Sequence, residues 1–114
     1  MEITAHSEWG ELHILGYGFD YKNGAIRDFL SDTRPVKTFK NLADTLDTIH
    51  EAGGKAFLAH PLTVTDDYSS LSSITARLKA AGIDGIEALY GPYDEEQKKN
   101  LSGIAENHDL LVSA

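Results

Sequence analysis

The sequence contains no cysteine, which excludes disulfide bonds and thiolate metal sites. Any bound metal ion would therefore need His, Asp and Glu as ligands. Long hydrophobic runs are also absent, and no apolar segment approaches the roughly 20 residues that cross a bilayer. The acidic start "MEITAHSEWGE" has neither the basic nor the apolar part of a signal peptide. We therefore expect a cytoplasmic protein that does not enter membranes.

Basic residues are few, with 10 Lys and Arg against 18 Asp and Glu and a net charge of −8. This balance disfavours a general nucleic-acid surface, because phosphate backbones are held mainly by Lys and Arg. A phosphate-bearing substrate stays compatible with it, because a metal ion can supply positive charge locally. A length of 114 residues suits one domain with a single core.

Strand and helix patterns alternate along the chain, which favours an α/β fold with a mostly parallel sheet. A short helix or loop is expected before Pro35, over 25–35. The last predicted strand has no helix behind it, and its exposed edge suggests part of a larger fold. Strands are predicted over 2–6, 11–19, 55–60, 84–91 and 110–114, and helices over 39–54, 70–82 and 93–109.

The stretch "GGKAFLAHP" is typical of a short buried strand that ends in a histidine, His60. A period of two places Ala56, Leu58 and His60 on one face of this strand. In parallel α/β folds, functional residues gather at the carboxyl ends of the strands. His60 is therefore a candidate site residue. The alternative is a capping histidine whose ring binds a loop carbonyl.

A second candidate is His13, which lies among apolar residues in "LHILGY". Its imidazole needs a polar partner, because burial of an unpaired polar group is costly. Glu2 lies on the preceding predicted strand, although by itself it would be a solvated terminal residue. Imidazole and carboxylate ligands together suit Zn, Mn or Fe.

Three further residues lie near the carboxyl end of the strand "DGIEALYG". Glu87 is either an acid near the site or a buried carboxylate that pairs with a Lys or a backbone amide. Tyr90 and Tyr93 flank a Gly-Pro turn and are possible rim residues of the site. His50 lies in the last turn of its predicted helix, and its only expected role is a favourable interaction with the helix dipole.

Three segments in this order resemble the PHP (polymerase and histidinol phosphatase) family, in its branch of metal-dependent phosphoesterases. They are "EITAH…ELHILGYGFD", "IHEAGGKAFLAHP" and "DGIEALYGPYDEEQKKNLSGIAENHDLLVSA". The resemblance implies a distorted TIM-like barrel that holds up to three divalent metal ions and hydrolyses phosphoesters with metal-activated water. It implies that Glu2, His13 and His60 are metal ligands, because they match the family's strand glutamate, the histidine before "LGY" and the histidine of "AHP".

The sequence also departs from the family pattern. The family's His-x-His segment before Glu2 and its Ser-Asp-x-His segment after the final strand are not in residues 1–114, and its helical insertion is mostly absent between about 24 and 40. We therefore expect a single partial PHP domain that binds one divalent ion (Mn, Zn or Fe) and has little or no activity by itself. No catalytic residue is assigned beyond the metal ligands.

Two main functions stay open. In the first, the chain is part of a phosphoesterase that acts on a phosphorylated small molecule, a nucleotide or a short nucleic acid. The second is a non-catalytic remnant that binds metal or forms homo-oligomers, in which another copy covers the open sheet edges. A third, a doubly wound regulatory domain, would need acids at the strand ends, where this sequence offers histidines.

Overall fold

The computed structural model describes residues 2–18 and 40–114. The helix or loop expected over 25–35 lies outside these residues, and so does nearly all of the stretch from about 24 to 40 where the insertion was expected to be missing. No helix in the described ranges is both long and apolar enough to span a bilayer.

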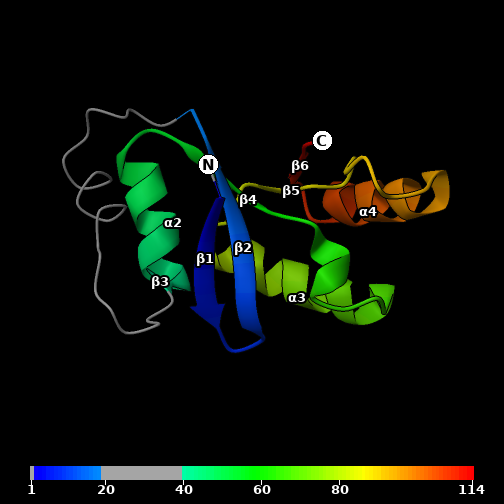
Figure 1. The fold of residues 1–114 in the computed structure, drawn as a ribbon, viewed down its shortest axis with the longest axis horizontal. Coiled ribbons are helices and arrows are strands. Elements are labelled where there is room, and N and C mark those ends of the chain that lie inside the picture. Colours follow the sequence, from blue (N-terminus) through cyan, green and yellow to red (C-terminus); the bar gives the residue numbers. More distant parts are fainter. Residues whose placement is uncertain (1, 19–39) are drawn as a thin grey trace.

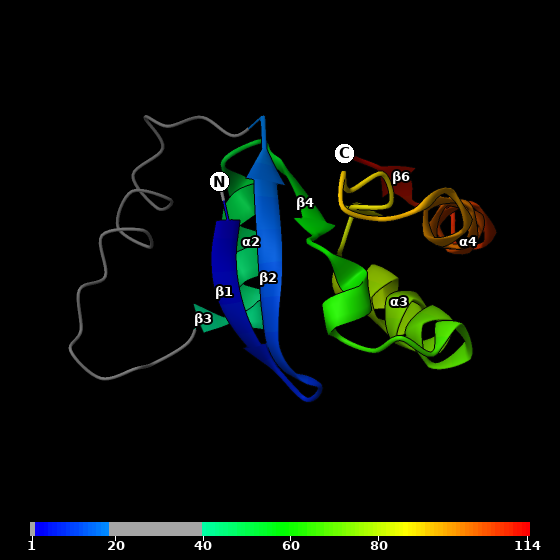
Figure 2. The same ribbon diagram turned by 45° about the vertical axis from the view of Figure 1, so that its right-hand side comes forward.

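The described residues form a six-stranded sheet with the strand order β3-β1-β2-β4-β5-β6 (Figures 1 and 2). Strand β2 pairs antiparallel with β1 and β4, whereas the pairs β1–β3, β4–β5 and β5–β6 are parallel. The strands are β1 (Glu2–Ser7), β2 (Gly10–Tyr17), β3 (Lys40–Asn41), β4 (Lys55–Leu58), β5 (Gly85–Ile86) and β6 (Leu111–Val112).

The prediction of a mostly parallel sheet is therefore wrong, because the sheet is mixed. Only Glu8 and Trp9 separate β1 from β2, and so short a turn permits only an antiparallel pair. The expected turn at Trp9-Gly10 lies one residue earlier, and Gly10 begins β2 with a φ of 93°. The strand predicted over 84–91 is shorter, since β5 covers only Gly85–Ile86.

The three predicted helices are confirmed as α2 (Leu42–Glu51), α3 (Tyr68–Ala81) and α4 (Glu95–Asn107). Helix α2 begins three residues later than predicted, because Asn41 caps it and belongs to β3. A short 3-10 helix, η1 (Pro61–Thr63), follows β4. Helix α2 packs against β1 and β4, whereas α3 packs on α4 and α4 lies beside β6 (Figures 1 and 2).

Alternation along the strands gives the sheet two different faces. The core face carries buried apolar side chains that belong to one cluster with helix residues such as Leu46 and Leu71. Its strand members are Ile3, Ala5, Leu12, Ile14, Ala56, Leu58 and Ile86. The opposite face, here called the site face, carries Glu2, Thr4, His13, Leu15, Phe57 and Gly85 by the register of the strands.

Gly85 occupies a position where only glycine fits. A Cβ atom there would lie 2.3 Å from Cε2 of Phe57 and 2.6 Å from the carbonyl oxygen of Leu111. The phenyl ring therefore covers β5 directly, and the backbone of β6 can approach from the other side. This close packing keeps β4, β5 and β6 together next to the carboxyl ends of β4 and β5.

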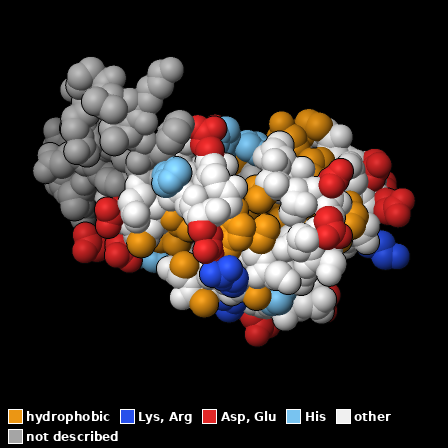
Figure 3. Space-filling model, turned by 90° about the horizontal axis from the view of Figure 1, so that it is seen from below, with side chains coloured by type: hydrophobic (Ala, Val, Ile, Leu, Met, Phe, Trp, Pro, Cys, Tyr) orange, Lys and Arg blue, Asp and Glu red, His pale blue; other side chains and the backbone are white. Residues whose placement is uncertain are grey.

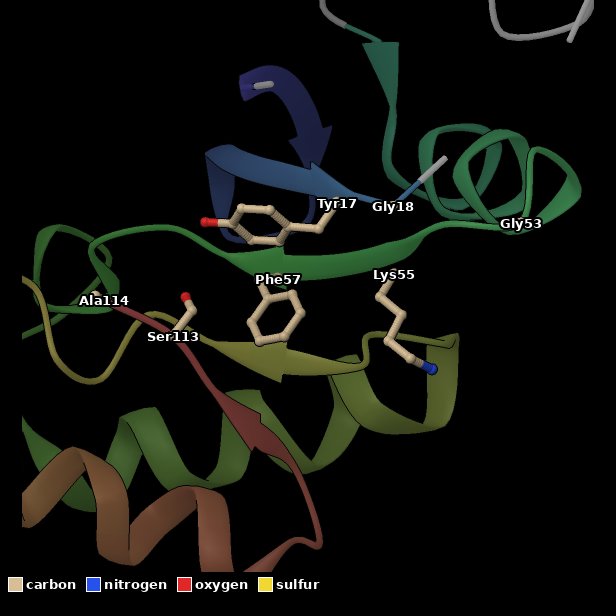
Figure 4. Close-up of a pocket in the computed structure, with 7 residues that line it drawn as sticks. All are labelled: Tyr17, Gly18, Gly53, Lys55, Phe57, Ser113 and Ala114. Carbon is tan, nitrogen blue, oxygen red and sulfur yellow. The ribbon is translucent and has the colours of Figure 1, made fainter. Parts of the chain in front are cut away.

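A cavity on the site face lies over the end of β2 and the start of β4, away from His13 (Figure 4). It has a volume of about 560 Å³. The Tyr17 ring meets the Phe57 ring edge-on, with 5.3 Å between the ring centres. Figure 4 shows Phe57 between Ser113 and Lys55, with Tyr17 above it. This cavity contains none of the three predicted metal ligands.

Candidate metal centre

The structure brings Glu2, His13 and His60 together on the site face. One ligand atom from each residue lies within 4.8 Å of the other two. Nδ1 of His13 is 3.1 Å from Nε2 of His60. The Glu2 carboxylate oxygens are 3.7 Å from the His13 nitrogen and 3.6 Å from the His60 nitrogen. Residues that are far apart in the sequence thus converge on one point.

The β1–β2 hairpin positions two of these residues. Glu2 lies opposite Leu15, and Thr4 lies opposite His13, so that Glu2 and His13 share a face as diagonal neighbours across the two strands. Side chains at such diagonal positions are within reach of each other when they are long. The register of the hairpin therefore fixes this half of the site.

His60 reaches the site by leaving the strand. Strand β4 ends at Leu58, and His60 has φ 29° and ψ 65°. Continued alternation would place its side chain on the core face with Ala56 and Leu58, which is the arrangement that the sequence predicted. The prediction is wrong, because the positive φ turns the imidazole to the site face. Pro61 then occupies the first position of η1.

The Thr63 hydroxyl contacts both the backbone and the ring of His60. It donates to the His60 carbonyl oxygen at 2.9 Å and lies 3.0 Å from Nδ1 of the His60 ring. Nε2, the other ring nitrogen of His60, faces Glu2 and His13. Thr63 therefore holds the side of the ring that points away from the other two candidate ligands.

The three residues fit a single divalent ion. Two imidazoles and one carboxylate are a donor set of catalytic zinc sites, which leave a fourth position open. In a tetrahedral site with ordinary Zn–N bonds, two ligand nitrogens are roughly 3.3 Å apart. The observed 3.1 Å is close to that separation. The side chains of Glu2, His13 and His60 are 48%, 33% and 21% exposed, so that solutes can reach them.

A smaller cavity of about 250 Å³ opens beside this centre. His13 and His60 line it, together with Glu11, Ala59, Thr63 and Val64. Its position next to the donor atoms gives water or a small substrate room to approach the centre. Sequence reasoning did not single out Glu11 or Thr63. A hydroxyl three residues after His60 was the available signal for Thr63, because Ser and Thr often bond backbone groups at this spacing.

Glu87 is a buried carboxylate, 8% exposed, that accepts a hydrogen bond from a backbone amide. Its Oε1 is 2.7 Å from the backbone nitrogen of His60. Tyr90 lies farther out, with its ring centre 6.1 Å from that of His60. Tyr93 packs edge-on against Tyr90 and accepts a hydrogen bond from the Leu62 amide at 3.1 Å. A role of these tyrosines as a substrate rim stays a prediction.

Two other histidines have partners elsewhere. His50 was expected only to interact with the dipole of its helix, but its Nε2 also lies 2.7 Å from Oδ2 of Asp84. The same oxygen accepts a hydrogen bond from the Ala56 amide at 2.8 Å, at the beginning of β4. His108 at the end of α4 contacts the Ser72 hydroxyl of α3 at 2.9 Å. Both pairs join neighbouring elements.

Burial raises the pKa of Tyr93 above its ordinary value, and the negative charge of Glu87 adds to this effect, while the hydrogen bond from Leu62 opposes it. The folded protein therefore holds the phenolic proton more tightly than the unfolded chain does. This contribution to stability is complete below about pH 10, the ordinary tyrosine pKa, and is lost as the pH rises through the higher folded pKa.

We expect the stability of Tyr93→Phe to fall less steeply than that of the wild type as the pH rises above about 10. Urea midpoints measured at several alkaline pH values check this, and equal slopes for both proteins would contradict it.

No family model and no curated protein matches the sequence. Two solved structures share the fold. A protein from Bifidobacterium adolescentis, assigned as a metal-dependent phosphoesterase, matches with a TM-score of 0.68, 18% identity and 97% of this chain covered. An amidohydrolase from Chromobacterium violaceum, solved with bound sulfate and no metal, matches with a TM-score of 0.79, 19% identity and 99% coverage.

The chain spans 64% of the length of each of these two structures. At such identities the likeness shows the fold alone. The fold is α/β with an open, mixed sheet, compatible with part of a barrel-like fold.

Proposed function

We propose that this chain carries a divalent metal centre that serves phosphoester hydrolysis, and that its fold is that of the PHP family. The observation that carries the proposal is the convergence of Glu2, His13 and His60 on one point. The fold shared with a protein assigned as a metal-dependent phosphoesterase supports it.

Each residue has a defined part in this proposal. Glu2, His13 and His60 would hold the ion, and Thr63 orients the His60 ring through its contact with Nδ1. A divalent ion bound there would supply Lewis-acid chemistry, that is, polarisation of a phosphoryl oxygen and a lower pKa for a bound water. The cavity of about 250 Å³ beside the two histidines receives the phosphoester.

The charge of the molecule agrees with a cation-dependent site. Acidic side chains are spread over the face in Figure 3, whereas Lys and Arg occupy only small areas of it. An anionic substrate would be repelled by this acidic excess unless a bound cation attracted it locally. We therefore propose a small phosphoester as the substrate rather than a long nucleic acid, which would need an extended basic surface.

The proposal is tested by metal binding and turnover together. We expect about one Mn²⁺ or Zn²⁺ ion per chain by calorimetry and elemental analysis. We expect slow hydrolysis of bis(4-nitrophenyl) phosphate that stops when EDTA removes the ion. His50→Ala, which removes a histidine outside the centre, should leave both unchanged. Absence of Mn²⁺ and Zn²⁺ binding at millimolar concentrations would overturn the proposal.

A second candidate is a metal-binding module without turnover. The observation that favours it is the small donor set, because only one group of three possible ligands occurs among the residues that the structure describes. A bound ion with no hydrolysis of the phosphodiester would support this candidate over the first.

A further inference from the structure

We propose that Glu87 is a positioning residue of the metal centre, which holds the backbone of His60 so that the imidazole faces Glu2 and His13. This inference rests on the proposed function, because it assigns Glu87 a role in assembling the same site. Glu87 belongs to no group of candidate ligands among the described residues. Its effect on the ion would be exerted through His60.

The need for such a residue follows from the faces of the sheet. His60 follows a strand whose residues Ala56 and Leu58 point into the core. An extended backbone at residues 59 and 60 would send the imidazole to that same face, away from the other two ligands. The centre therefore depends on a change of backbone direction between Leu58 and His60.

That change places His60 in a conformation that non-glycine residues rarely adopt, with φ 29°. Such a conformation is strained for a non-glycine residue and persists only where surrounding contacts impose it. A backbone held this way at a candidate ligand needs a specific restraint.

Hydrogen bonds restrain three consecutive residues at this point. The Leu58 carbonyl accepts from the Glu87 backbone amide at 2.9 Å, and the Ala59 amide donates to the His13 carbonyl at 2.9 Å. The His60 amide donates to Oε1 of Glu87 at 2.7 Å. Glu87 therefore holds the chain on both sides of Ala59, through its backbone and through its side chain. The His60 amide is the one of these three groups that a side chain restrains.

The chemistry of Glu87 suits this task. A hydrogen bond from a backbone amide to a carboxylate is shorter and stronger than one between neutral groups. A carboxylate that is 8% exposed is costly to bury unless it is well paired.

Asp84 provides a matched control. It is a carboxylate at the other end of β5, and its Oδ2 accepts a hydrogen bond from the Ala56 amide at the beginning of β4. Asp84 thus binds a backbone amide inside β4 and Glu87 binds one just beyond its end, but only Glu87 does so at a candidate ligand. Asp84→Ala should lower stability without changing the metal affinity.

The experiment compares the wild type with Glu87→Ala, Glu87→Gln and Asp84→Ala. We expect Glu87→Ala to weaken Zn²⁺ binding about 10- to 100-fold by calorimetry, as loss of an outer-shell partner does. Glu87→Gln keeps an oxygen that can accept from the His60 amide, and should recover affinity to within about threefold of the wild type. The absorption spectrum of bound Co²⁺ should change in Glu87→Ala and be restored in Glu87→Gln.

Hydrogen exchange at the His60 amide is a readout that needs no metal. We expect exchange about tenfold faster or more in Glu87→Ala, and unchanged in Asp84→Ala. If the wild type binds no metal, the proposed function fails, and this measurement alone decides the role of Glu87. If Glu87→Ala does not fold, Glu87→Asp takes its place, since its shorter side chain draws the carboxylate away from the amide.

Two results would overturn the inference. One is an unchanged Zn²⁺ affinity in Glu87→Ala together with unchanged exchange of the His60 amide. The other is an equal loss of affinity in Glu87→Ala and Asp84→Ala, which would show that any weakened link between β4 and β5 has the same effect.

Discussion

Replacement of His60 by alanine is expected to weaken binding of Mn²⁺ or Zn²⁺ by at least about 100-fold, because changes to outer-shell partners alone cost 10- to 100-fold. His60 is one of three candidate ligands, and its Nε2 lies 3.1 Å from Nδ1 of His13. Its removal leaves one imidazole and one half-exposed carboxylate, which cannot surround an ion. Calorimetric titration with each metal measures the change.

The matched control for this variant is His50→Ala. His50 is also a histidine at the end of a structural element with a carboxylate partner, Asp84, but it lies outside the candidate centre. We expect its replacement to leave the affinity for the ion unchanged. If His60→Ala bound the metal as tightly as the wild type, the ion would be held by other residues and the proposed centre would be wrong.

The residue types of this centre could be predicted from the sequence, but part of its geometry could not. Glu2 and His13 share a face because a short turn sets the register of β1 and β2, and the sequence shows both the turn and the alternation. His60 was placed on the wrong face, because a period of two assumes that the strand continues. Its positive φ has no signature in a non-glycine residue.

Contacts between distant segments could not be predicted from the sequence either. The patterns named Glu87 as a possible buried acid but could not identify the His60 amide, 27 residues away, as its partner. The helices were predicted well because capping and apolar periodicity are local signals. The sheet was predicted as mostly parallel because strand order depends on pairing over long distances, and the antiparallel pair of β2 with β4 leaves no local trace.

The alternation of the sheet leads to a prediction that separates stability from metal binding. Leu58 is fully buried on the core face, in a row with Ile14 and Ile86. We expect Leu58→Ala to lower the free energy of unfolding by about 2–5 kcal/mol, the usual cost of such a truncation. This is a large part of the roughly 5–15 kcal/mol that stabilises a typical domain. Urea unfolding measures it.

The same row offers a matched control, since Val112 pairs with Ile86 on the edge strand and is 43% exposed. Val112→Ala should change the free energy of unfolding by no more than about 0.5 kcal/mol. While Leu58→Ala stays folded, its metal affinity should equal that of the wild type, because Glu87 and His13 contact this segment through the backbone of residues 58–60. A loss of affinity in step with the loss of stability would contradict this separation, and would mean that packing on the core face also directs the His60 imidazole.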